Sequence, residues 1–341
     1  MSEASVNSAT GTARSEEAIA AAPVRVRTWW KVAAVAASTV VAATLAISAP
    51  AAAAPAAQNN TAADPFTDPI ITIVHGTSET TTNPWKAVDL RCGGHFIGGG
   101  GYVAGPVSQN VGLSQIAPGS RGGALLDDPH AMRVSATAAP ETTPANWTLH
   151  AYGICAYRLQ GVEYRRDYVS AAQAGRGPLS AMARCSPGKS LVGMGGQSFA
   201  IPGQVRLSTL APGNDVVLAR VTPQPNPTAS WAVQSIAVCA DHDAAEIVSG
   251  HTGLDDRDAM SATAQCPAGQ HPTGAGFGHG GEEGNLMQSL LMPTSDRLLA
   301  TTRTDTRTAT GNWLSSTYAL CLTAYDPNNP TRMNSRLSIW R

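Results

Sequence analysis

Acidic residues close to a histidine are the strongest candidates for chemistry in this chain of 341 residues. Asp127, Asp128 and His130 lie in the segment 121–130 (RGGALLDDPH), and Asp255-Asp256 form a second acidic pair. Two carboxyl groups held roughly 5–10 Å apart can hydrolyse a glycosidic bond. Adjacent acidic residues are also common in solvated turns, and no GxSxG or HExxH motif accompanies them. We therefore predict no catalytic residue and treat Asp127, Asp128 and His130 as candidate ligand-binding residues.

Three other patterns are weak signals for metal, phosphate or dinucleotide sites. His279, Glu282 and Glu283 (GHGGEEGN) could ligate a metal, but a glycine-rich loop holds ligands poorly in place. The segment 183–190 (ARCSPGKS) fits the loose form of the phosphate-binding loop, although a related segment, CPAGQH, has neither Lys nor Ser. The glycines of 276–281 match a dinucleotide-binding motif only in their spacing, and they indicate a close backbone approach. We predict a structural turn at 183–190, no metal and no cofactor.

All six cysteines belong to a pattern that occurs three times. Each copy has a cysteine, a glycine-rich apolar stretch, a proline, and a tryptophan that precedes a second cysteine by eight residues. The copies are Cys92–Pro118–Trp147–Cys155, Cys185–Pro212–Trp231–Cys239 and Cys266–Pro293–Trp313–Cys321. Such constant spacing predicts one structural unit used three times. We place the units at 70–163, 164–243 and 244–325, with a C-terminal tail or closing strand at 326–341.

The first copy is longer than the others between its proline and its tryptophan. The separation is 29 residues there, against 19 and 20 in the other copies. The extra residues lie near 121–130, the segment that holds Asp127, Asp128 and His130. Because inserted surface loops on a repeated scaffold often carry function, we expect this segment to be a surface loop that takes part in binding.

The pattern of apolar residues predicts β-strands throughout. Short apolar runs are separated by Gly, Pro, Asn or Asp, and no sustained helical period follows the leader. In the strand expected before Cys155, Leu149 and Ala151 share one face while His150 and Tyr152 share the other. We predict an all-β fold of three tandem, disulfide-stapled antiparallel repeats with a pseudo-threefold arrangement. The arrangement would be prism-like or would consist of three small sandwiches.

Symmetry reduces the possible cysteine pairings to two schemes. Pairing within each copy gives Cys92–Cys155, Cys185–Cys239 and Cys266–Cys321, whereas pairing between copies gives Cys155–Cys185, Cys239–Cys266 and Cys92–Cys321. We favour pairing within copies, because it joins the first strand of each unit to its last. The wide spacing and the lack of a CxxC knuckle argue against metal binding by these cysteines.

The repeated tryptophans, Trp147, Trp231 and Trp313, have two interpretations. They could form the core, each ring packed on a disulfide as in immunoglobulin-type sandwiches, or they could be three platforms on which sugars stack. We favour structural core positions.

The N-terminal part of the sequence indicates export. Residues 1–53 have the charged, apolar and small-residue order of a cleaved signal peptide, and 54–69 has the composition of a disordered spacer. The chain has 23 basic and 24 acidic residues. Four of the basic and three of the acidic residues lie in the leader. The nearly neutral remainder argues against nucleic acid and against an anionic membrane surface as partners. We predict a secreted protein with no membrane attachment after cleavage.

The frame CPxGxxxxGxGG…P…W…C resembles a repeat of secreted actinobacterial proteins, mostly of unassigned function, over about residues 70–325. The high alanine and arginine content, with three lysines, also suggests an actinobacterium. Three β repeats with Cys and Gly look like the vitelline membrane outer layer proteins and the jacalin-type lectins, which are threefold β-prisms. The resemblance implies a secreted all-β protein and does not imply an activity.

These observations predict a secreted, non-enzymatic binding or surface protein that recognises a glycan or cell-wall polymer through its repeat loops. One alternative is a secreted hydrolase with an acid pair assembled between repeats. Another is a purely structural protein of the cell envelope. The sequence does not indicate the oligomeric state.

Overall fold

The computed structural model describes residues 68–106, 111–120, 127–139, 145–174, 177–201, 203–223, 229–255, 259–280, 286–293, 299–306 and 312–324. Residues 127, 173, 174, 259, 286–293 and 299–306 are described by their backbone alone. The predicted signal peptide at 1–53, nearly all of the spacer at 54–69 and the tail at 326–341 lie outside this part of the chain.

The described chain forms eighteen strands and one short helix, six strands in each repeat. Repeat 1 contains β1 (Ile70–Thr77), β2 (Trp85–Arg91), β3 (His95–Ala104), β4 (Val111–Ser120), β5 (Asp127–Ala138) and β6 (Thr148–Tyr157). Repeat 2 contains β7 (Glu163–Ser170), α1 (Ala171–Ala174), β8 (Leu179–Arg184), β9 (Ser190–Phe199), β10 (Val205–Pro212), β11 (Val216–Pro223) and β12 (Ala232–Ala240). Repeat 3 contains β13 (Glu246–His251), β14 (Ala259–Gln265), β15 (Gln270–Gly280), β16 (Leu286–Pro293), β17 (Leu299–Thr306) and β18 (Leu314–Thr323). The all-β prediction is confirmed, and no helix among the described residues is long and apolar enough to cross a membrane.

The six strands of each repeat form two antiparallel half-sheets. The first, sixth and third strands pair in one half-sheet, and the second, fifth and fourth strands pair in the other. In repeat 1 these are β1-β6-β3 and β2-β5-β4. The segment from each tryptophan to its second cysteine is a strand, as predicted, and this strand lies at the centre of a half-sheet.

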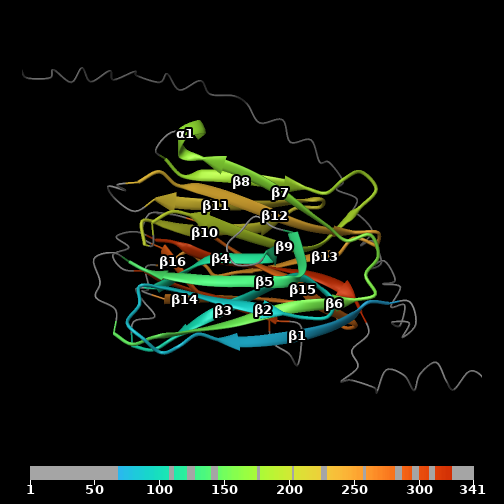
Figure 1. Cartoon of the computed structure of the whole chain (residues 1–341), viewed down its shortest axis with the longest axis horizontal. Coiled ribbons are helices and arrows are strands. Elements are labelled where there is room, and N and C mark those ends of the chain that lie inside the picture. Colours follow the sequence, from blue (N-terminus) through green and yellow to red (C-terminus); the bar gives the residue numbers. More distant parts are fainter. Residues whose placement is uncertain are drawn as a thin grey trace, which may run out of the picture. The chain divides into compact units, whose positions relative to one another are not determined.

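Each half-sheet continues into a half-sheet of another repeat, and we call the strand pair that joins them a seam. Sheet I has the order β1-β6-β3-β16-β17-β14, sheet II β2-β5-β4-β9-β12-β7 and sheet III β13-β18-β15-β10-β11-β8 (Figure 1). The seams are β3–β16, β4–β9 and β10–β15. Every sheet thus takes strands from two repeats, and the repeats follow one another in a closed cycle. This connectivity is pseudo-threefold, and it rules out three separate sandwiches.

The glycine-rich strands β3, β9 and β15 contact one another. A Cβ on Gly98 of β3 would meet the carbonyl of Thr273 of β15, and a Cβ on Gly193 of β9 would meet the carbonyl of Ile97 of β3. Backbone approaches this close leave no room for a side chain. The repeated glycines are therefore explained by the meeting of three strands rather than by a nucleotide site.

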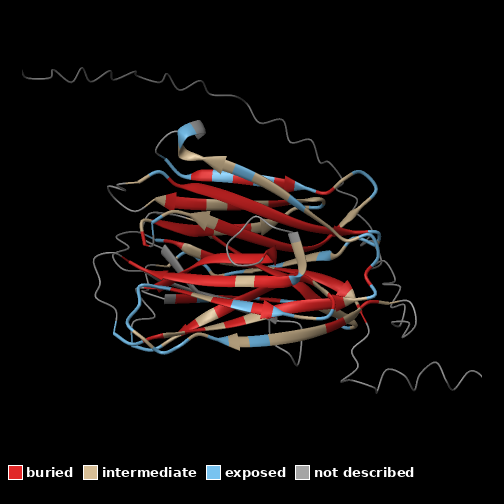
Figure 2. Ribbon diagram, viewed as in Figure 1, coloured by how far each residue is buried: buried red, intermediate tan, exposed pale blue. Residues whose placement is uncertain are grey.

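The main hydrophobic core is one cluster that takes buried residues from all three repeats, and it includes Phe96, Met132 and Leu149 of repeat 1. A second and smaller core, which includes Ile154 and Ile236, lies on the opposite face of β6 and β12. Burial is concentrated on the inner strands, whereas β1 and β7 at the sheet edges are more exposed (Figure 2). One face of β6 is therefore core along its length, and the other face changes from polar to apolar along the strand.

Three disulfides connect the sheets. The bonds are Cys92–Cys155, Cys185–Cys239 and Cys266–Cys321, the pairing within repeats. In each bond the first cysteine follows an edge strand of one sheet and the second lies in an inner strand of another sheet. Sheet I is therefore bonded to sheet II, sheet II to sheet III, and sheet III to sheet I. Each pair of sheets is held by one covalent link.

Trp147 is buried at the end of β6 that is far from the disulfide. Eight residues of extended chain span about 26 Å, so the expected packing of its ring on the Cys155 disulfide is wrong. The indole Nε1 donates instead to the carbonyl of Asn83 at 3.0 Å, and Lys86 Nζ lies 4.8 Å from the ring centroid. Lys86 also donates to Thr81 Oγ1 at 2.8 Å. Burial lowers the pKa of Lys86, while Glu79 partly opposes this.

The other two repeated tryptophans, Trp231 and Trp313, are also buried. The faces of all three rings are therefore covered by protein, which leaves no surface for a sugar to stack on.

Candidate binding site

Four aromatic and imidazole rings meet on sheet I, on the face of β6 opposite to the main core. They are His75 of β1, Tyr102 of β3, and His150 and Tyr152 of β6, and we call them the ring cluster. Strand register brings them together, because His150 pairs with Tyr102 and Tyr152 pairs with His75. His75 is exposed, and the other three rings are partly exposed.

The rings of the cluster contact one another closely. Tyr102 and His150 stack with their centroids 4.4 Å apart, and His75 meets Tyr152 edge to face at 4.6 Å. Thr77 Oγ1 lies 3.3 Å from His150 Nδ1. Partial burial, with Tyr102 beside it, raises the pKa of Tyr152 to about 12, so its hydroxyl stays protonated at neutral pH. The cluster thus presents aromatic carbon together with hydrogen-bonding groups.

The ring cluster is not repeated in the other two units. The residue pairs that correspond to Tyr102–His150 are Gln197–Gln234 in repeat 2 and Gly278–Ser316 in repeat 3. These two positions therefore carry rings in repeat 1, carboxamides in repeat 2 and small groups in repeat 3, whereas single tyrosines, Tyr168 and Tyr318, lie on the same face in repeats 2 and 3. The four-ring cluster is therefore a feature of repeat 1 and not of the shared repeat pattern.

The residues predicted to bind a ligand lie elsewhere, at the start of β5. The expected surface loop is wrong for Asp127–His130, because these residues extend β5, and Ser120 pairs with Asp127. Residues 121–126 and the side chain of Asp127 lie outside the described part of the chain. Asp128 forms an ion pair with Arg91 at 2.9 Å and also accepts a hydrogen bond from the backbone N–H of His130 at 3.2 Å.

The structure brings two further residues to Asp128 and His130. The His95 ring lies 5.9 Å from the His130 ring, and His130 Nδ1 lies 2.7 Å from the carbonyl oxygen of Gly94. Tyr164 of repeat 2 donates to the carbonyl of Phe96 at 2.9 Å. Burial, followed by the His130 charge, lowers the pKa of His95, and burial, followed by the Asp128 charge, raises the pKa of Tyr164.

The described contacts of Asp128 and His130 lie within repeat 1, and Tyr164 links the neighbouring backbone to repeat 2 by donating to the carbonyl of Phe96. Asp128 already has partners within the protein, and no second carboxylate among the described side chains contacts it in a way that would form an acid pair. The group is therefore a weaker candidate for ligand binding than the ring cluster.

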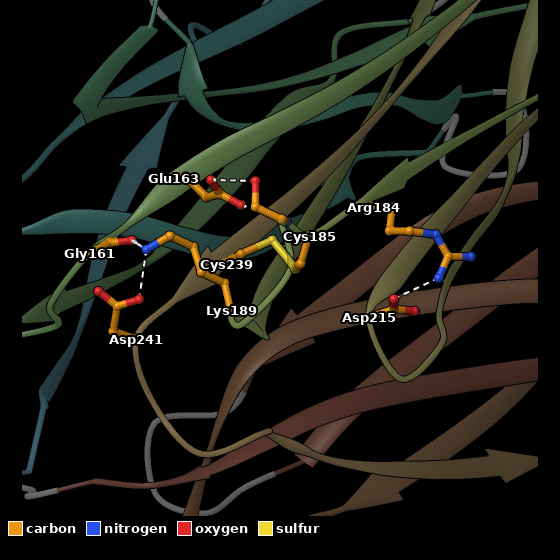
Figure 3. Close-up of a disulfide and its surroundings, with 9 residues drawn as sticks. Gly161, Glu163, Arg184, Cys185, Lys189, Asp215, Cys239 and Asp241 are labelled. Carbon is orange, nitrogen blue, oxygen red and sulfur yellow. Dashed lines mark hydrogen bonds and ion pairs between the residues drawn. A yellow bond between two sulfur atoms is a disulfide. The ribbon is translucent and has the colours of Figure 1, made fainter.

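The phosphate-loop-like segment 183–190 is a turn beside the Cys185–Cys239 disulfide, as predicted (Figure 3). Lys189 Nζ donates to Asp241 at 2.8 Å and to the carbonyl of Gly161 at 2.6 Å. Ser186 donates to Glu163 through its backbone N–H and its hydroxyl. The groups that would bind phosphate are thus occupied by protein partners.

The suggested metal ligands are only partly described. Glu282 and Glu283 lie outside the described residues, and burial lowers the pKa of His279 to about 3, which keeps its ring neutral. Among the described side chains, no group of three or more His, Cys, Asp or Glu residues is arranged to hold a metal ion. Of the second acidic pair, Asp255 forms a β-bridge with Trp313, and Asp256 is not described.

The sequence matches no protein-family model and has no significant match among curated proteins.

His150 and Tyr152 share one face of the strand expected before Cys155, but their pattern alone does not mark them as site residues. The available signal was the run HAY at 150–152, where polar rings alternate with a small core residue. Tyr102 and His75 could be added only once the pairing of β3 and β1 with β6 was known.

Proposed function

We propose that this protein is a secreted, non-enzymatic binding protein that recognises a glycan or cell-wall polymer. The observation that carries the proposal is the ring cluster on sheet I. Tyrosine and histidine rings offer an apolar surface for the C–H groups of a sugar, and their hydroxyl and ring nitrogen atoms bind its hydroxyl groups. The cluster is partly exposed, lies on a rigid sheet and occurs in one repeat alone.

The three disulfides support a location outside the reducing cytoplasm. Such bonds persist in oxidising compartments and are rare in the cytosol. An extracellular binding protein also benefits from a scaffold that stays folded without a partner. The expected signal peptide supports the same location.

The alternative of a secreted hydrolase has weaker support. Its acid pair would have to come from Asp127 and Asp128 or from Asp255 and Asp256, and among these the described carboxylate of Asp128 is neutralised by Arg91. No observation favours this activity over binding.

Retention of the purified protein on a glycan array and on insoluble cell-wall polysaccharide tests the proposal. We expect the parent protein to be retained and the His150→Ala variant to bind at least tenfold more weakly. Ser316→Ala, at the corresponding position of repeat 3, is the matched control and should bind as the parent does. If the parent protein is not retained at millimolar concentration of sites, the binding function is refuted and a structural envelope protein becomes the better description.

A further inference from the structure

Two threonines lie on the same face of sheet I as the ring cluster, beyond its His150 end. Thr148 of β6 comes two residues before His150 and therefore points to the same side of the sheet. Its Oγ1 atom lies 2.7 Å from Oγ1 of Thr80, which follows β1 in the chain, and this hydrogen bond is exposed. The hydroxyl pair is therefore open to a ligand that also contacts the ring cluster.

The threonine pair and the ring cluster form one continuous surface along β6. Thr148, His150 and Tyr152 alternate along the strand, and at 3.3 Å per residue the first and last are about 13 Å apart. Thr77 of β1 is exposed, and its Oγ1 atom lies 3.3 Å from His150 Nδ1. We call the ring cluster together with Thr77, Thr80 and Thr148 the β6 strip. The strip has hydroxyl groups at one end and rings at the other, and it is longer than a single sugar ring.

The threonine pair occurs in repeat 1 and not at the corresponding place in repeat 3. The backbone bridge beside the pair, Thr81–Trp147, has its counterpart in Asp255–Trp313. The place of Thr80–Thr148 is therefore taken in repeat 3 by Leu254–Leu314, and Leu254 is 66% exposed. Since an exposed leucine occupies the same position of the same fold, folding of the repeat does not require a hydroxyl group there.

The charged residues around the strip favour an uncharged ligand. The strands β1, β3 and β6 contain no Asp, Glu, Lys or Arg. Glu79, which precedes Thr80, is exposed and adds a negative charge beside the threonine pair. Lys86 is buried, and its Nζ atom donates to the carbonyl of Glu79 at 2.6 Å and to Thr81 Oγ1 at 2.8 Å. Proteins generally bind carboxylate and phosphate groups through Arg or Lys, and the described cation of this loop is already engaged within the protein.

We propose that the β6 strip binds an uncharged oligosaccharide of several sugar units, which lies along β6. Sugar units lie over the ring cluster, and a further unit forms hydrogen bonds with the hydroxyl groups of Thr80 and Thr148, each of which can donate and accept. This proposal rests on the proposed glycan-binding function. It adds the class of the ligand, its length and two residues that determine specificity.

The test measures the affinity of the secreted protein for cellohexaose, hexaacetylchitohexaose, the disaccharide cellobiose and the anionic hexagalacturonate. It is carried out at pH 8, where histidine in general is uncharged. The variant is Thr80→Val/Thr148→Val, which keeps the size of both side chains and removes their hydroxyl groups. Thr263→Val is the matched control, because Thr263 is exposed on β14 at the other edge of sheet I.

We expect the double variant to bind a neutral hexasaccharide about tenfold more weakly than the parent, as for the loss of hydrogen bonds to two hydroxyl groups. The control should bind as the parent does. Cellobiose, which is too short to reach from the rings to the threonine pair, should bind equally to all three proteins. A variant that was merely less stable would instead lose affinity for both lengths and would melt at a lower temperature.

Three outcomes would contradict the proposal. Equal binding of the hexasaccharides by the double variant and the parent would overturn the extended site. Binding of hexagalacturonate as tight as that of the neutral sugars would overturn the ligand class. If neither neutral hexasaccharide binds, the whole proposal is refuted, and retention on the glycan array that is lost in His150→Ala would show that glycan binding by the ring cluster still stands.

Discussion

Tyr102 and His150 stack almost parallel, with 7° between their ring planes, on the paired strands β3 and β6. Stacked rings in this geometry contribute about 0.5–1.5 kcal/mol beyond the burial of their surface. We expect a double-mutant cycle of Tyr102→Ala and His150→Ala to give a coupling energy in unfolding of about this size. Denaturant melts of the four proteins measure it. A coupling near zero would mean that the rings do not support each other and that the cluster is loosely held.

The cyclic set of disulfides predicts that the native protein has no free thiol. Ellman titration of the denatured, unreduced protein should give a value near zero and should give six thiols after reduction. The Cys185–Cys239 bond closes a loop with a sequence separation of 54 residues. The double variant Cys185→Ser/Cys239→Ser should therefore lose about 4 kcal/mol of unfolding free energy in the chain-entropy model. An unchanged denaturation midpoint would show that this bond does not constrain the unfolded chain.

Gly98 is expected to tolerate no side chain. A Cβ at this position would meet the Thr273 carbonyl and the Gly274 Cα of β15 at 2.5 and 3.0 Å. Gly98→Ala should destabilise the protein by about 1–3 kcal/mol, in the range of other overpacking substitutions. Gly177→Ala is the control, because a Cβ there meets nothing within 4 Å. Similar melting temperatures for the two variants would contradict the close packing of the three glycine-rich strands.

Trp147 is expected to be structural. Trp147→Ala removes a buried ring and its hydrogen bond to Asn83, and it also removes the ring next to the Lys86 ammonium group. A loss of about 3–5 kcal/mol is typical for truncation of a buried aromatic side chain. Trp85→Ala, at an exposed position, should cost far less. Calorimetric melts compare the two, and a Trp147→Ala variant that melts like the parent would contradict a core role.

His279 should make the protein less stable in acid. The residue keeps some exposed surface, but its Nε2 is buried, and burial lowers the pKa from 6.5 to about 3. Between these values the unfolded chain binds a proton that the folded chain does not. The unfolding free energy therefore falls as the pH falls from 6.5 towards 3, by up to about 1.4 kcal/mol per pH unit from this residue.

The His279→Gln variant measures this contribution. Its unfolding free energy should depend less steeply on pH than that of the parent between pH 6 and 4. Equal slopes for His279→Gln and the parent would mean that His279 does not titrate differently in the folded and unfolded states.

The repeat pattern in the sequence predicted local structure well. The tryptophan-to-cysteine segments became β6, β12 and β18, and the strand alternation around His150 and Tyr152 is present in the structure. These features are local, because side-chain direction in a strand alternates residue by residue. The fold class and the preferred cysteine pairing could therefore be predicted from the spacing of a few residues.

The sharing of sheets between repeats could not be predicted in the same way. The seam between β3 and β16 pairs Tyr102 with Leu290, which are remote in the chain, and no residue type marks such a pairing. The pairing of Gln115 with Gln197 depends on seam register as well. A bulge between Leu113 and Gln115 changes which side chains of β4 share a face, so the sequence alone did not single out Gln115 and Gln197 as neighbours.

Because the three sheets join the repeats in a closed cycle, the fold does not require any particular repeat to come first in the chain. Repeat 1 meets repeat 3 through β3 and β16, although no peptide segment links these two repeats directly. Ile71, near the start of the described body, and Ala324, at its end, belong to the same small core. A circular permutant that begins with repeat 2 and ends with repeat 1 would keep all three seams and all three disulfides. The closed cycle of three repeats thus has no first or last member, although the chain that forms it has two ends.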